Sequence, residues 1–200
     1  MTRGRFVAFE GGEACGKSTQ AALLAQAIGA VLTREPGGTT LGEEVRSLLL
    51  HADHDVDARA EALLMAAARA QHVREVIEPA LREGRHVVSD RFTASSLAYQ
   101  GGGRGLPLDE VRSLSAFATE GLEPDVYVLL DLDPAAAAAR RTRAQDRMES
   151  AGDEFHGRVR DAFLALAAED ADRWLVVDAA GAVDDIAAIV ASRVRGIIGA

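Results

Sequence analysis

A short glycine-rich stretch limits what this chain can fold into more than any other part of its sequence. Residues 11–18 read Gly-Gly-Glu-Ala-Cys-Gly-Lys-Ser, which fits the pattern G-x-x-x-x-G-K-[ST]. An apolar run, Phe6-Val7-Ala8-Phe9, precedes the stretch, and a helical pattern follows it. In that context the glycines let successive backbone N–H groups point inward, and the helix N-terminus adds partial positive charge. The stretch therefore predicts a loop that cradles phosphate groups.

Lys17 and Ser18 carry the predicted chemistry of this loop. The Lys17 ammonium can reach β- and γ-phosphates, and the Ser18 hydroxyl can bind Mg²⁺. Lys17 is the only lysine of the chain, because every other strongly basic residue is an arginine. A wide planar guanidinium and a slim ammonium are not interchangeable in a tight cradle. The retained lysine favours a phosphate site over the alternative, a glycine-rich turn that binds nothing.

Length, charge and cysteine content narrow the class of protein. The chain has 200 residues, of which 48% are hydrophobic and 26% charged, and its formal net charge is −9. These values fit one globular domain, and such an acidic chain is a poor candidate for nucleic-acid binding. The single cysteine, Cys15, excludes an intramolecular disulfide and fits a reducing compartment. No secretory signal or membrane-length apolar run is visible, so we expect a soluble, cytoplasmic protein with no membrane partner.

Short apolar runs alternate with longer helical patterns along the chain. The predicted strands are 5–10, 30–34, 86–90, 125–131 and 174–178. The predicted helices are 17–28, 40–51, 57–83, 108–119, 134–143, 153–170 and 183–197. The run 126–130 is apolar at every position, which is typical of a parallel strand covered by helices on both faces. The sequence therefore predicts one doubly wound α/β domain over residues 1–200, with about five parallel strands flanked by helices.

Polar and glycine-rich stretches follow the predicted strands, at the edge of the sheet where α/β proteins bind ligands. Residues 33–39 read TREPGGT after the second strand, and residues 89–91 read SDR at the end of the third. Beside a phosphate loop, a carboxylate at a strand end suits Mg²⁺, so Asp90 joins Ser18 as a predicted metal ligand. Arg34, Arg69 and Arg91 are candidates for contacting a second phosphate. The alternative for the Asp90-Arg91 pair is a surface ion pair in an ordinary turn.

An arginine cluster stands out in this acidic chain, formed by Arg140, Arg141, Arg143 and Arg147. Positions 140, 143 and 147 share one face at helical spacing. Residues 145–152 interrupt the helical pattern, which favours a lid at about 140–152 over a plain solvated helix face. Arginines that close over a triphosphate neutralise the charge that develops in phosphoryl transfer.

Together these motifs resemble the thymidylate kinase family of P-loop nucleoside monophosphate kinases. The resemblance is carried by residues 9–20, TREPGGT at 33–39, RAQH at 69–72, DRF at 90–92, SSLAYQG at 95–101 and DRME at 146–149. The TREPGGT and SSLAYQG segments are far more specific than the phosphate loop. The resemblance implies the P-loop NTPase fold and a homodimer. It also implies transfer of the ATP γ-phosphate to dTMP in the presence of Mg²⁺, giving dTDP and ADP for dTTP synthesis.

The resemblance also implies which residues bind each nucleotide. Residues implied to bind ATP are Gly11, Gly12, Glu13, Ala14, Cys15, Gly16, Lys17, Ser18 and Thr19. Residues implied to bind dTMP are Glu13, Arg34, Met65, Arg69, Arg91, Ser96, Tyr99 and Gln100. Within that set the arginines hold the acceptor phosphate, and Glu13 lies near the sugar 3′-hydroxyl or the metal. Ser96 and Gln100 face the thymine edge, Tyr99 faces the deoxyribose, and Met65 stands where many members stack a Phe on the base.

The catalytic charge is implied to come from the lid. Ala14 and Cys15 bring no positive charge to the loop, as in the bacterial subtype of the family, in which a lid arginine completes the charge. The implied catalytic residues are Lys17, Arg91, Arg143 and Arg147.

Two other functions remain open from the sequence. The first is a nucleoside monophosphate kinase that prefers another base, and the second is a nucleotide-dependent switch with negligible turnover. The motifs on the acceptor side favour a kinase, since a switch needs no second phosphate site.

Overall fold

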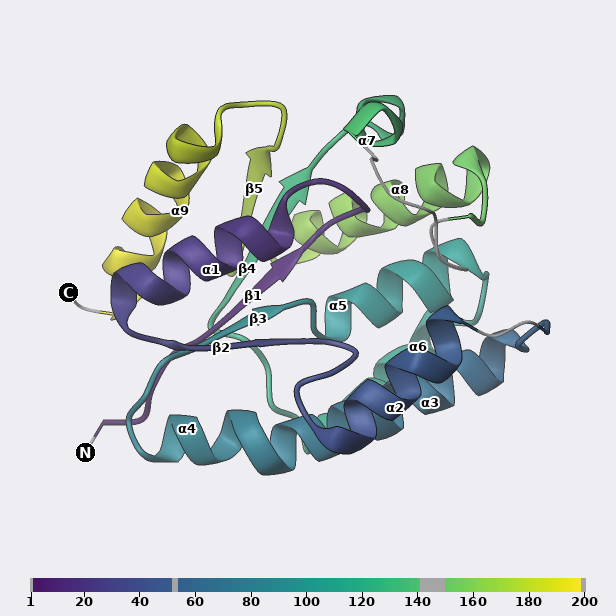
Figure 1. The fold of residues 1–200 in the computed structure, drawn as a ribbon, viewed down its shortest axis with the longest axis horizontal. Coiled ribbons are helices and arrows are strands. Elements are labelled where there is room, and N and C mark those ends of the chain that lie inside the picture. Colours follow the sequence, from purple (N-terminus) through teal and green to yellow (C-terminus); the bar gives the residue numbers. More distant parts are fainter. Residues whose placement is uncertain (1, 52–53, 141–149, 199–200) are drawn as a thin grey trace.

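The computed structural model describes residues 2–51, 54–140 and 150–198. Within these residues a five-stranded sheet has the order β2-β3-β1-β4-β5, and every neighbouring pair is parallel (Figure 1). The strands are β1 (Phe6–Glu10), β2 (Val31–Arg34), β3 (Val87–Asp90), β4 (Val126–Asp131) and β5 (Trp174–Asp178). Each strand lies inside its predicted range, so the predicted parallel α/β sheet is confirmed.

The helices follow the predicted pattern with two differences: residues 73–77 are π-helical, and residues 93–103 form a helical segment that was not predicted. They are α1 (Lys17–Ile28), α2 (Thr40–Leu50), α3 (Ala58–His72), η1 (Val73–Ile77), α4 (Glu78–Arg82), α5 (Thr93–Ser96), η2 (Leu97–Gly103), α6 (Leu108–Thr119), α7 (Pro134–Arg140), α8 (Asp153–Glu169) and α9 (Val183–Ile198). The predicted helix 57–83 is one helical run of α3, the π-helical η1 and α4. Asp57 caps its start by accepting from the backbone N–H groups of Arg59 and Ala60, and Gly84 follows its end with φ +79°. Residues 141–143 of the predicted helix 134–143 lie outside the described residues.

The helical segment 93–103 was not predicted, because three consecutive glycines read as a loop. These glycines meet a packing requirement instead. A Cβ on Gly102 would lie 2.5 Å from the Cβ of Ala162, and one on Gly103 would lie 2.5 Å from the Phe155 ring. The missing side chains let α8 lie directly against η2, and the tight contact with α8 holds η2 in place.

Both faces of the sheet are buried, as the continuously apolar strands predict. Phe6 and Ala8 of β1 pack into a core that includes residues of η1, α4, η2 and α8. Val7 and Phe9 point to the opposite face and pack with α1 and α9, which lie side by side in Figure 1. Within the described residues, no helix is both long and apolar enough to cross a membrane.

Strand register brings the motifs together at the carboxyl ends of the strands. Asp90 of β3 is the register partner of Phe9 in β1 and of Arg34 in β2. The phosphate loop, the TREPGGT segment and the Asp90-Arg91 pair therefore leave the sheet next to one another. This edge is where open α/β sheets bind their ligands.

Candidate active site

The phosphate loop has the backbone that its glycines predict. Gly11 and Gly16 have φ values of +139° and +92°, and Ala14 also adopts a left-handed conformation at +55°. A Cβ on Gly11 would lie 2.5 Å from the carbonyl oxygen of Leu130 in β4. The loop is thus tightly packed at a position that tolerates only glycine.

Lys17 bends back over this loop. Its side chain is buried, and Nζ donates to the carbonyl oxygen of Gly12 at 2.5 Å. The buried Cys15 thiol donates to the same oxygen at 3.1 Å. The lysine ammonium is therefore held within the loop that the sequence predicts to surround phosphate oxygens.

Ser18 and Asp90 meet beside the loop. The Ser18 hydroxyl donates to Asp90 Oδ2 at 2.5 Å, although the two residues are 72 positions apart. A hydroxyl and a carboxylate are the hard oxygen donors that Mg²⁺ prefers, and Mg²⁺ usually takes its remaining ligands from water and substrate phosphates. Among the described residues, no group of three or more His, Cys, Asp or Glu side chains could hold a metal alone. The pair fits a Mg²⁺ ion that shares its coordination with a nucleotide.

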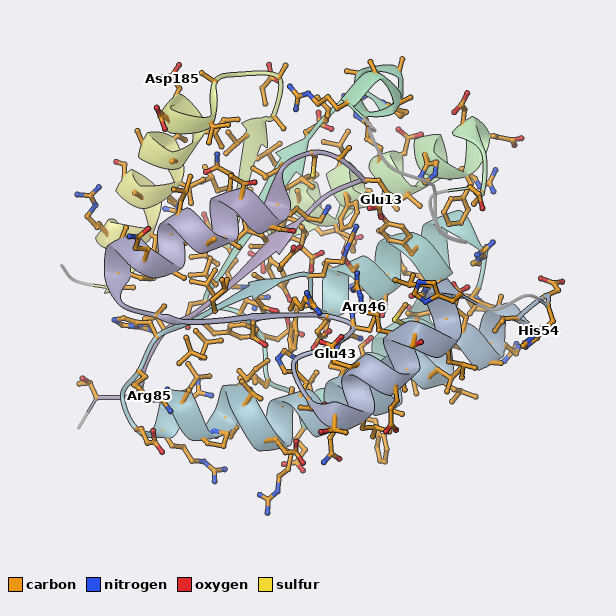
Figure 2. All side chains as sticks on the ribbon, viewed as in Figure 1. Glu13, Glu43, Arg46, His54, Arg85 and Asp185 are labelled. Carbon is orange, nitrogen blue, oxygen red and sulfur yellow. The ribbon has the colours of Figure 1, made fainter. Side chains whose placement is uncertain are left out.

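A cleft opens next to the loop. Predicted dTMP-side residues that line it are Glu13, Met65, Arg69, Arg91, Ser96, Tyr99 and Gln100. Lining residues without a predicted role are Glu35, Pro36, Arg46, Leu50, Ala68 and Ser95. Figure 2 labels one residue of each group, Glu13 on the β1–α1 loop and Arg46 on α2. The structure thus collects nearly the whole predicted acceptor side in one place.

Arg91 links the cleft to the phosphate loop. Its Nη1 donates to the Gly11 carbonyl oxygen at 3.1 Å, and its Nη2 donates to Glu13 Oε1 at 2.6 Å. The Tyr99 hydroxyl donates to the same Glu13 oxygen at 2.7 Å. Arg91 has a φ of +73°, an uncommon conformation for a non-glycine residue that persists where its surroundings enforce it. These contacts fix the guanidinium between the two candidate phosphate sites.

Glu13 stays ionised in this position. Burial disfavours its charged form, but the positive charges of Arg91 and Lys17 outweigh burial and lower the pKa of Glu13 to about 2. A permanent negative charge therefore holds Arg91 at every pH near neutrality.

Arg69 lies at another part of the same cleft, and its side chain is only 3% exposed. Its Nε donates to Glu35 Oε2 at 2.7 Å, Nη1 to Ser96 Oγ at 3.0 Å and Nη2 to the Phe92 carbonyl oxygen at 3.1 Å. Although burial opposes ionisation of Glu35, the neighbouring Arg69 and His72 lower its pKa. Arg69 is thus hydrogen-bonded to Ser96, a predicted thymine-edge residue, whereas Arg91 is hydrogen-bonded to the phosphate loop.

Arg34 and Arg140, two of the predicted arginines, do not line the cleft. Arg34 does not line it, because its guanidinium makes two hydrogen bonds to Glu43, at 3.0 and 3.1 Å, and its side chain is 55% exposed. In the predicted lid, Arg140 donates to the Ala179 carbonyl oxygen at 2.9 Å. Arg141, Arg143 and Arg147, together with the rest of 141–149, lie outside the described residues.

Glu10 is a charged residue of the site that the sequence did not reveal. It is fully buried at the end of β1, where its carboxylate accepts from Phe92 N at 2.9 Å and from Ser95 Oγ at 2.6 Å. Burial raises the pKa of Glu10 to about 7, even though Ser95 and Arg91 oppose the shift. A lone glutamate after an apolar strand gives no local signal of such contacts, because both partners lie more than 80 positions away.

Comparisons with known proteins identify the family of this chain. A family model described as thymidylate kinase matches residues 9–189. A thymidylate kinase of Leifsonia xyli is 54% identical, with 96% of this chain and 95% of the relative covered. Another from Bifidobacterium longum is 51% identical, with coverages of 96% and 98%. The crystal structure of thymidylate kinase from Ehrlichia chaffeensis superposes with a TM-score of 0.80 at 31% identity, covering 96% of this chain and 99% of that one. Together with the site geometry, these matches show that the chain belongs to the thymidylate kinase family.

Proposed function

We propose that this chain transfers the γ-phosphoryl group of ATP to dTMP, giving ADP and dTDP, with Mg²⁺ as the metal ion. The observation that carries the proposal is the hydrogen bond from Arg91 Nη1 to the Gly11 carbonyl oxygen. It joins the phosphate loop to a cleft that is lined with polar and basic side chains. Phosphoryl transfer requires two anions held in line, and these adjoining sites supply that arrangement.

On the donor side, residues Gly11 to Thr19 surround the ATP phosphates. Lys17 leaves the Gly12 carbonyl oxygen and contacts the β- and γ-phosphates. Ser18 and Asp90 would hold Mg²⁺, which would neutralise phosphate charge and orient the donor. The 2.5 Å distance between Ser18 Oγ and Asp90 Oδ2 supports this assignment.

On the acceptor side, we assign the phosphate end to Arg91 and the base end to Arg69, Ser96 and Gln100. Arg91 lies against the phosphate loop and Arg69 lies against Ser96. Arg46 of α2, which donates to the Pro36 carbonyl oxygen at 3.1 Å, also lines the cleft and is a further cation near the acceptor. Arg34 can take part only by exchanging Glu43 for the nucleotide. Tyr99 and Glu13 lie between these ends, where the sugar fits, and Met65 covers the base.

The chemistry needs no general base, since the attacking atom is an anionic phosphate oxygen. The protein supplies positioning, charge and exclusion of water. Lys17 and Arg91 supply part of the positive charge. The lid at about 140–152 supplies the remainder through Arg143 and Arg147, which close over the transferring group.

A coupled assay with a panel of monophosphates tests the proposal. We expect the highest kcat/KM with dTMP among dTMP, dCMP, GMP and UMP. An equal or better rate with another monophosphate would assign the site to a different base. Failure to transfer label from ATP to any monophosphate, with ATP binding intact, would favour a nucleotide-dependent switch.

We also propose a homodimer that acts in the cytoplasm. Phe117 of α6 is 85% exposed and Leu63 of α3 is 58% exposed, and both line one groove between these helices. Large apolar side chains exposed together favour an interface. A second copy of the chain is the simplest partner for this surface.

A further inference from the structure

A buried carboxylate lies behind one of the residues proposed to read the base. Glu61, in the first turn of α3, has no exposed surface. Its Oε1 accepts from Gln100 Nε2 at 2.9 Å, and its Oε2 accepts from Arg104 Nη2 at 3.2 Å. Gln100 is only 1% exposed and lines the cleft. Glu61 itself does not line the cleft, so any effect on the nucleotide acts through Gln100.

We propose that Glu61 is a positioning residue that sets base selectivity by fixing which end of the Gln100 amide faces the cleft. An ionised carboxylate has only acceptors, so the NH₂ end of the amide must meet it. The amide oxygen is on the other side of the same planar carbon and is therefore turned away from Glu61. Both oxygens of Glu61 act as acceptors, Oε1 for Gln100 Nε2 and Oε2 for Arg104 Nη2, so this carboxylate offers no donor to the Gln100 amide oxygen.

The backbone around Gln100 restricts other arrangements of this side chain. Arg104 N donates to the Tyr99 carbonyl oxygen at 2.8 Å, and Leu106 N donates to that of Gln100 at 3.0 Å. These two hydrogen bonds hold the turn of η2 that carries Gln100, so a backbone shift that moved the amide away from Glu61 would have to break them. Rotation of the amide is the remaining alternative, and it would place two oxygen acceptors against each other.

A fixed acceptor at the base end of the cleft has a chemical consequence, which rests on the proposed function. Thymine and uracil carry an N3–H donor, whereas cytosine carries an N3 lone pair. The side-chain carbonyl oxygen of Gln100 accepts a hydrogen bond from the N3–H of thymine or uracil. Against cytosine it faces the N3 lone pair, so two acceptors remain unpaired in the buried site, which weakens binding. The Ser96 hydroxyl can donate or accept, so it cannot make this distinction. Glu61 therefore selects for a pyrimidine that is protonated at N3.

The test compares binding of dTMP and dCMP by calorimetry in wild type, Glu61→Gln, Gln100→Ala and the double variant. In Glu61→Gln, the new amide can accept from or donate to Gln100, so both orientations of Gln100 become available. We expect the ratio of the dCMP Kd to the dTMP Kd to fall by about tenfold, the value of one hydrogen bond. The double variant should have the ratio of Gln100→Ala alone, because Glu61 acts only through Gln100.

Glu110→Gln is the matched control, since Glu110 pairs with Arg59 of the same helix α3 in an exposed ion pair. It should leave the ratio unchanged. If Glu61→Gln does not fold, Glu61→Gln/Arg104→Met removes both charges together and is read in the same way. An unchanged ratio, or an equal fall with and without Gln100, overturns the inference. Failure of the wild type to phosphorylate dTMP overturns the proposed function instead.

Discussion

Glu35 and Arg69 form an ion pair between the β2–α2 loop and α3, with Nε and Oε2 2.7 Å apart and both side chains at most 5% exposed. His72 completes the arrangement, because its Nδ1 lies 2.9 Å from Glu35 Oε1 and its Nε2 lies 2.6 Å from Thr33 Oγ1. A Cβ on Gly38 would lie 2.7 Å from Thr33 Oγ1. The TREPGGT and RAQH motifs, far apart in the sequence, therefore meet in one buried polar network that holds Arg69 at the cleft.

Removing Glu35 should destabilise the protein strongly. Glu35→Ala leaves the buried Arg69 guanidinium without its carboxylate, which costs about 3–5 kcal/mol of unfolding free energy. Urea unfolding measures this change. Glu110→Ala, which breaks an exposed ion pair with Arg59, is the control and should cost about 1 kcal/mol or less. Similar costs for the two variants would contradict a dominant role of the buried network.

Lys17 should be essential for turnover and dispensable for folding. Lys17→Ala removes the ammonium that contacts the transferring phosphate, and we expect kcat to fall at least about 100-fold. Lys17→Arg should fail as well, because a planar guanidinium does not fit the closed loop. Circular dichroism and thermal unfolding serve as folding controls. Near-normal activity in either variant would refute the assignment of the loop.

Glu10 should make stability fall as the pH rises toward neutrality. Its pKa is about 7 in the folded protein, against an ordinary value of 4.5, so between these values the folded state binds more protons than the unfolded state. The unfolding free energy then decreases from about pH 4.5 to pH 7, in total by about 3 kcal/mol. Glu10→Gln cannot titrate, and its difference from wild type across this window isolates the contribution.

Glu13 provides an internal check on that experiment. Its folded-state pKa is lowered to about 2, so its stabilising contribution is present above pH 4.5 and is lost as the pH falls toward 2. The two carboxylates therefore act in separate pH windows. A wild-type and Glu10→Gln difference that is flat between pH 4.5 and 7 would show that Glu10 titrates normally.

Phe117 tests the proposed dimer. Phe117→Asp places a charge in the exposed apolar groove beside α3 and should shift the protein toward monomer in size-exclusion chromatography with light scattering. Ile189→Asp on α9, where the isoleucine is 50% exposed, is the control and should leave the mass unchanged. A dimer that survives Phe117→Asp would place the interface elsewhere. A monomeric wild type would rule out the proposed dimer.

Local sequence was sufficient for the strands, for the helices outside residues 93–103 and for the phosphate loop. Apolar runs such as 126–130 marked the strands, because a parallel strand buried on both faces has no polar positions. Residues 11–18 marked the loop, because a cradle for phosphates depends on backbone freedom and one helix N-terminus, which are properties of adjacent residues. The motif resemblance added the family, and the comparisons confirm it.

Tertiary structure alone decided which side chains meet. Arg34 was predicted to contact a phosphate and Arg46 had no predicted role, but Arg34 pairs with Glu43 and Arg46 lines the cleft. The consecutive glycines of η2 indicate a loop in the sequence, whereas in the structure α8 packs against them. Glu10 and Glu61 looked like ordinary acidic residues, because their partners lie 39 to 85 positions away. Periodicity and backbone chemistry are local, whereas the burial and pairing of a charge depend on every element that packs around it.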